Sequence, residues 1–87
     1  MPLATPQSLP MFLKEVVEEI RDQQKAEPTN KNLVQRMRNQ AALLHKALIA
    51  KDSPDQIVQE AVQLAAYAAR VATEGDPEFR HYRWPYE

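Results

Sequence analysis

Seven prolines divide this 87-residue chain into segments, and their positions constrain the fold more than any other feature. Proline disrupts a helix interior but is accepted at a helix start and in loops. Three long uninterrupted segments lie between the prolines at positions 10, 28, 54 and 77, and each has apolar residues at helical spacing. None of them shows the strict alternation of a half-buried strand. The sequence therefore predicts an all-α fold.

The first two segments predict two amphipathic helices. Ser8 is a suitable N-cap for a helix over residues 8–24, and Thr29 or Asn30 is expected to start a second helix over residues 30–50. Each segment has an apolar stripe at helical spacing. The stripes are Leu9, Phe12, Leu13, Val16, Val17 and Ile20 in the first helix, and Leu33, Val34, Met37, Ala41, Leu44 and Leu48 in the second.

The third segment has the clearest boundaries and predicts a helix over residues 54–74. Ser53 is a good N-cap, Pro54 suits the first helical position, and Gln56 completes the spacing of a capping box. Gly75, the only glycine, stands where a left-handed C-cap residue is expected. The segment is apolar over more than half of its circumference, so we expect it to be the central helix.

Self-association is expected from the length of the chain and from its surplus of apolar positions. A domain this small buries a thin core unless a partner adds apolar surface. Leu43 and Ile49 lie outside the stripe of the second helix and indicate a second contact surface. We therefore predict a three-helix unit that assembles into a helical-bundle homo-oligomer.

Composition excludes several classes of protein. The chain has no cysteine, which excludes disulfides and thiolate metal sites and makes the cytoplasm the expected compartment. The start "MPLATPQSLP" has no basic region, and no apolar stretch is long enough to span a bilayer. A net charge of -1 argues against nucleic-acid binding. Lys31, Arg36 and Arg38 are then expected to form a solvated basic face.

Polar residues at the helix margins form the candidate ligand site. A narrow strip of the third helix, separate from its apolar arc, holds Glu60, Gln63, Tyr67 and Glu74. Carboxylates on neighbouring helices can hold Mg²⁺, which prefers oxygen ligands. The alternative is that these residues are ordinary boundary residues of the core. In the first interpretation, polar residues of all three helices would line one groove. They are Glu19, Gln23, Gln40, Glu60 and Gln63.

The segments "EVVEEIRDQQK" and "NQAALLHKALIAKDSPDQIVQEAVQLAAYAARVATEGDPEF" resemble the MazG-like branch of the all-α nucleoside triphosphate pyrophosphatases. The resemblance covers roughly residues 15–79. Glu19 and Gln23 match the Glu and Gln of the family's first helix, Ala47 and Leu48 match an Ala-Leu pair, and Glu60 matches the first acid of the Glu-x-x-Asp motif. The resemblance implies a nucleotide ligand at Glu19 and Gln23, with Glu60 as a ligand of Mg²⁺. Gln40, Gln63 and Tyr67, which share the polar margins of the helices, complete the set of candidate ligand-binding residues.

The departures from the family's motifs imply that catalysis is weak or lost. The family's Glu-Glu-x-x-Glu motif falls at Asn39, Gln40 and Leu43, and Gln63 replaces the final aspartate. One remaining carboxylate makes a poor magnesium site. If the protein is active, the resemblance implies a magnesium-dependent nucleoside triphosphate pyrophosphohydrolase, and no catalytic residue can be assigned.

The tail "FRHYRWPYE", within residues 76–87, alternates aromatic and basic side chains. Such a tail can stack on a nucleotide or dock on apolar surface of its own or a neighbouring subunit, and we expect docking. Three hypotheses follow for the chain. The preferred one is a nucleotide-binding helical protein, and the alternative is a non-catalytic oligomer acting as a partner-binding or inhibitory module. The third, a nucleic-acid binder, rests only on the basic residues.

Overall fold

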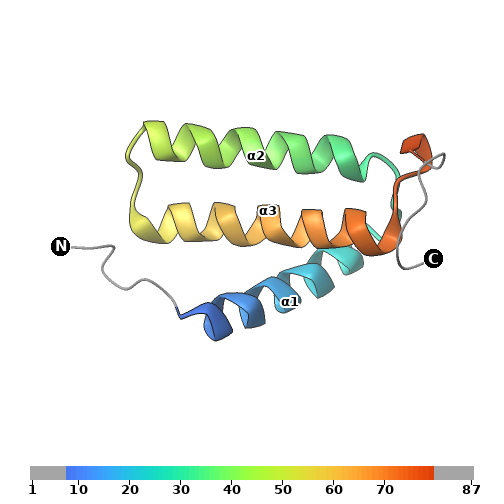
Figure 1. Cartoon of the computed structure of the whole chain (residues 1–87), viewed down its shortest axis with the longest axis horizontal. Helices are drawn as coiled ribbons and strands as arrows, with labels where there is room; N and C mark the ends of the chain where they lie inside the picture. The colour runs from blue at the N-terminus through green and yellow to red at the C-terminus, as the bar shows by residue number, and fades with distance from the viewer. Residues whose placement is uncertain (1–7, 80–87) are drawn as a thin grey trace.

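The computed structural model describes residues 8–79, which form three α-helices and a short 3-10 helix (Figure 1). The described residues contain no strand, so the all-α prediction is confirmed. Residues 1–7 and the aromatic tail from position 80 onward lie outside the described part. The elements are α1 (Leu9–Ala26), α2 (Leu33–Ile49), α3 (Pro54–Glu74) and η1 (Pro77–Phe79).

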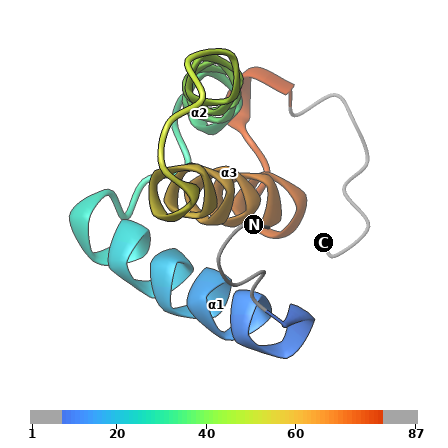
Figure 2. The same cartoon turned by 90° about the vertical axis from the view of Figure 1, so that its left-hand side faces the viewer.

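Helix α3 is the central element, as predicted. Within the described residues, α1 and α2 each pack against α3, and they do not contact each other. The view along α2 and α3 shows the helices stacked in the order α2, α3, α1, with α1 crossing α3 obliquely (Figure 2). The buried cluster between α1 and α3 is small and consists of Val16, Val62 and Ala66, with Phe12, Ile20, Val58 and Ala65 partly buried around it.

Serine side chains cap two of the helices where the sequence predicted it. Ser8 Oγ accepts a hydrogen bond from the Met11 N–H at 3.4 Å, and Ser53 Oγ accepts one from the Gln56 N–H at 3.2 Å. The Gln56 side chain donates to Glu60 instead of returning to the cap. Only the serine half of the predicted capping box is therefore formed in the described part of the chain.

The predicted start of α2 at Thr29 or Asn30 is wrong, because both side chains are used elsewhere. Thr29 Oγ1 accepts from the Lys31 N–H, and the Asn30 amide donates to the Glu74 carbonyl at 3.0 Å. The N-cap is Asn32, in a left-handed conformation with φ 62° and no capping bond from its side chain. The first turn of α2 is instead capped from a distance, since the Val34 N–H donates to Asp76 Oδ2 at 2.9 Å.

The end of α2 has the hydrogen bonds of a Schellman motif. The Asp52 N–H donates to the Ala47 carbonyl at 3.0 Å, and the Lys51 N–H donates to the Leu48 carbonyl at 3.2 Å. Lys51 has φ 57°, the left-handed conformation that glycine adopts at lowest cost. A lysine therefore occupies a position that favours glycine.

Gly75 ends α3 as predicted, but in a different conformation from the one expected. Its φ of 74° and ψ of -175° lie outside the left-handed helical region, in a region that is essentially restricted to glycine. The Gly75 N–H donates to the Val71 carbonyl at 3.0 Å. The prediction of a positive φ is confirmed, whereas the prediction of a left-handed helical residue is wrong.

The buried line of α1 and of α2 differs from the predicted apolar stripe. In α2, Gln40 and Ala47 are buried, whereas Ala41 and Leu48 are exposed. At 100° per residue, the apolar stripe and the buried residues point in different directions around the helix axis. The angle between these two directions is roughly 40° in α1 and roughly 70° in α2. The reason is that each helix packs on one neighbour only. The apolar residues left exposed in α1 include Leu9, Leu13 and Val17.

Candidate functional site

Glu60, the predicted metal ligand, has both carboxylate oxygens engaged by amide groups. Gln40 Nε2 donates to Glu60 Oε1 at 2.6 Å and to the Glu60 carbonyl at 3.2 Å, and Gln56 Nε2 donates to Oε2 at 3.0 Å. A metal ion at Glu60 would compete with these bonds. The described residues contain no group of three or more His, Cys, Asp or Glu side chains placed to hold a metal ion.

A second pair of predicted ligand residues lies on the α1 side of α3. Gln23 Nε2 donates to Glu19 Oε2 at 3.2 Å and to the backbone carbonyl of Gln63 at 3.4 Å. Gln23 Oε1 is buried and has no hydrogen-bond partner within the described residues. The structure thus brings Glu19, Gln23 and Gln63 together, one turn of α3 away from the pair of Gln40 and Glu60.

Tyr67 lies one further turn along the same side of α3 and is half-buried. Burial raises the pKa of Tyr67, and the negative charge of Glu27 raises it further, while Arg36 and Arg70 act in the opposite direction. The net effect keeps the phenol protonated well beyond neutral pH. Its hydroxyl can therefore donate a hydrogen bond to a ligand on this side of the helix.

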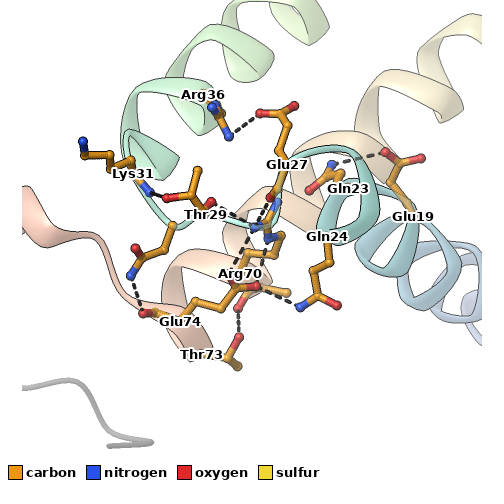
Figure 3. A network of polar contacts seen from close by, with 12 residues as sticks. Glu19, Gln23, Gln24, Glu27, Thr29, Lys31, Arg36, Arg70, Thr73 and Glu74 are labelled. Carbon is orange, nitrogen blue, oxygen red and sulfur yellow. Dashed lines mark hydrogen bonds and ion pairs between the residues drawn. The ribbon is translucent and has the colours of Figure 1, made fainter.

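Arg70 is the most buried charged residue and the centre of a polar network (Figure 3). Its Nε and Nη2 donate to the two carboxylate oxygens of Glu74 at 2.9 and 3.1 Å. Nη2 also donates to the carbonyl of Glu27 at 2.9 Å and to that of Thr29 at 3.4 Å. Because those carbonyls lie between α1 and α2, Arg70 holds this connection against α3.

The neighbours of Arg70 extend the network across all three helices. Gln24 of α1 donates to Glu74 Oε2 at 2.9 Å, and Arg36 of α2 pairs with Glu27 (Figure 3). The hydrogen bond from Arg70 is the main cause that lowers the pKa of Glu74, with a smaller contribution from Gln24. Glu74 therefore remains ionised at neutral pH and compensates the buried guanidinium.

Arg70 and Asp76 were not predicted from the sequence. Arg70 follows Val62 and Ala66 at intervals of four residues, on the line of α3 that is buried. A single charged residue on the face of α3 that carries Val62 and Ala66, within an alanine-rich segment, was the signal that could have identified Arg70. Asp76 is 2% exposed and caps the start of α2, although no local pattern links it to Val34.

The opposite side of α3 is apolar. Ala61, Ala68 and Ala72 fall within about 40° of one another around the helix axis and lie roughly opposite Gln63 and Arg70. Ala68 is exposed, and the other two alanines are only partly buried. This side of α3 is therefore not covered by the described residues.

The exposed parts of the α1 and α2 stripes lie on the same side as these alanines. In both helices the rotation from the buried residues to the apolar stripe has the direction in which successive residues advance around the helix axis. Helices α1 and α2 lie on opposite sides of α3, and α1 crosses α3 obliquely (Figures 1 and 2). Both rotations turn the stripes toward the side of α3 that carries the alanines. We call this side the apolar face, and it comprises Leu13, Val17, Ala41, Leu48, Ala61, Ala68 and Ala72.

No family model, no curated protein and no solved structure matches the chain. The resemblance to the MazG-like pyrophosphatases therefore stays a prediction from the quoted motifs. Among the described residues, no helix is both long and apolar enough to cross a membrane.

Proposed function

We propose that this chain is a non-catalytic interaction module that forms a homodimer through its apolar face. The observation that carries the proposal is the contrast between the two sides of the layer. On the polar side, carboxylate and amide groups bond to one another. On the apolar face, large side chains are open to solvent, with Leu13 52%, Val17 46% and Leu48 51% exposed. Exposed apolar surface of this kind marks interaction sites.

The dimensions of the apolar face suit a dimer. The 21 residues of α3 make a helix about 31 Å long, and three helices packed side by side span about 25 Å. This side of the molecule therefore has room for the roughly 800 Å² that each partner contributes to a typical stable interface. Two copies can cover it through one twofold axis, because the same surface serves both subunits. The small alanines of α3 allow close approach of the two central helices.

Sedimentation equilibrium of matched variants tests this proposal. Ala68→Glu adds a charge that the free subunit leaves in solvent and that the dimer would bury without a partner, so we expect a 10.0 kDa monomer. Ala42→Glu is the control, because Ala42 is exposed on the side of α2 that faces away from α3. We expect this control and the wild type to dimerise at micromolar concentration. A monomeric wild type, or equal behaviour of the two variants, would contradict the proposal.

A second candidate function is nucleotide binding without hydrolysis on the polar side of the layer. It is supported by the protonated hydroxyl of Tyr67, which can donate a hydrogen bond to a ligand. Loss of catalysis follows from the motif, in which Glu60 is the one remaining carboxylate. Mg²⁺ is the metal that the resemblance implies.

A further inference from the structure

Basic residues are concentrated in one segment of the chain, whereas the rest of the chain is acidic. The net charge of the whole chain does not show this separation. Residues 28–51, which include all of α2, contain five lysines and arginines and no acidic residue. The rest of the chain has six basic and twelve acidic residues, and its net charge is -6. Asp52 and Asp55 follow immediately, so the basic character is strongest before the end of α2.

Four of these five cations lie on an exposed surface. Arg36 is the exception, because it pairs with Glu27. Lys31, Arg38, Lys46 and Lys51 are exposed, and none of them has an ion pair among the described residues. Arg38 and Lys46 project from the side of α2 that faces away from α3, and the ammonium group of Lys31 points away from the Arg70 network (Figure 3). We call these four residues the basic surface.

Lys51 places one of these charges at the end of α2, in the left-handed position of the Schellman motif. Its left-handed conformation costs on the order of 1 kcal/mol for any residue with a Cβ atom, and glycine would remove that cost. Residues held in unfavourable backbone conformations occur preferentially at functional positions. A lysine therefore stands at the end of α2 in a backbone conformation that favours glycine.

Screening allows the basic surface to act independently of the acidic residues of α1. The acidic residues of α1 lie beyond α3, two helix spacings or about 18 Å away. The Debye length at physiological ionic strength is about 8 Å. The net charge of -1, from which we expected no nucleic-acid binding, therefore does not describe the field in front of α2.

The affinity expected per charged contact favours a nucleic acid over an acidic protein as the partner. Exposed ion pairs between protein side chains contribute at most about 1 kcal/mol each. A nucleic acid duplex carries about one phosphate charge per 1.7 Å of axis, and the counterions released from it add affinity for every cation that docks. Lys31 to Lys51 spans about 30 Å, the length of duplex that presents about 18 phosphates.

We propose that the basic surface of α2 binds the phosphate backbone of a nucleic acid duplex, without reading its sequence. Within α2 the contacts are made by Arg38 and Lys46, which project away from α3, so the basic surface and the apolar face occupy different sides of α2. Binding is therefore independent of dimerisation. With four phosphate contacts, the logarithm of the binding constant falls with the logarithm of the salt concentration with a slope of about -3.6.

Fluorescence anisotropy with a labelled 20-base-pair DNA duplex at 25–200 mM NaCl tests the proposal. The test variant is Arg38→Glu with Lys46→Glu, and the matched control is Lys14→Glu with Lys25→Glu, which makes the same change in charge at exposed positions of α1. We expect the test variant to bind at least about tenfold more weakly at 50 mM salt and to lose about half of the salt slope. The control should change the affinity by less than about threefold.

Three results would overturn the proposal. The first is no binding by the wild type at 25 mM salt, and the second is an equal loss of affinity in the two variants. The third is displacement of the duplex by poly-L-glutamate as effectively as by unlabelled duplex at equal charge, which would assign the basic surface to an acidic protein. Circular dichroism of both variants confirms that a loss of binding does not reflect unfolding.

Discussion

Replacing Arg70 with methionine tests how strongly the polar network holds the three helices together. The arginine side chain is fully buried and makes four hydrogen bonds. Methionine fills much of the same volume, so the change removes the charge and the bonds and leaves only a small cavity. The carbonyls of Glu27 and Thr29 and the carboxylate of Glu74 then lose a common partner.

The expected loss in the free energy of unfolding is about 2–4 kcal/mol. Hydrogen bonds to a charged group contribute about 1.5–3 kcal/mol each, and removing one partner of a buried pair costs about 3–5 kcal/mol. The value here is at the lower end, because the Glu74 side chain is 22% exposed and water can replace part of the lost interaction. A domain of 87 residues has a total stability of about 4–13 kcal/mol. The variant is therefore expected to be marginally folded.

Urea unfolding followed by circular dichroism at 222 nm measures this loss. With a slope of about 1 kcal/mol per molar urea, the midpoint should fall by about 2–4 M at pH 7. The lowered pKa of Glu74 adds a pH signature. Its stabilising contribution is complete above the ordinary value of 4.5 and is lost as the pH falls through the folded value. The difference between wild type and variant should therefore narrow in acid.

Arg38→Met is the matched control, because Arg38 is exposed on α2 and has no ion pair among the described residues. It should change the free energy of unfolding by less than about 0.5 kcal/mol. An Arg70→Met protein as stable as this control, or a difference that does not change with pH, would refute the structural role assigned to Arg70.

Three further outcomes are expected. Gly75→Ala should lower the free energy of unfolding by about 1–3 kcal/mol, because its backbone conformation is essentially restricted to glycine; an unchanged urea midpoint would contradict this. Lys51→Gly should raise the free energy of unfolding by up to about 1 kcal/mol by relieving the left-handed lysine, and a fall in the melting temperature would refute that reason. Calorimetry with ATP and Mg²⁺ should show at most weak binding, and phosphate-release assays should show little or no hydrolysis; robust turnover that Glu60→Ala abolishes would establish an enzyme.

Local signals predicted the elements whose ends are determined locally. Helix α3 begins at Pro54 and ends at Glu74 because Ser53, Pro54 and Gly75 act within a few residues of the ends that they define. The start of α2 could not be found in this way. Its cap, Asp76, lies 42 residues beyond Val34 in the chain.

Burial was predicted less well than helix position. Helical periodicity identifies an apolar stripe, but it does not specify which part of that stripe meets a neighbour. In a layer where α1 and α2 each pack on one side only, Ala41 and Leu48 remain exposed although they belong to the stripe. The predicted ligand residues gather on the polar side of α3, as their helical spacing indicated. Their role in binding stays a prediction.

The distant cap on α2 has a consequence for how the chain folds during its synthesis. Asp76 reaches the ribosome exit long after α2 has emerged, so the first turn of α2 lacks its cap until α3 and the residues after it are available. Helices α1 and α2 also make no contact with each other that could hold them together before α3 arrives. Both helices therefore lack part of their native contacts until α3 and the residues after it are available.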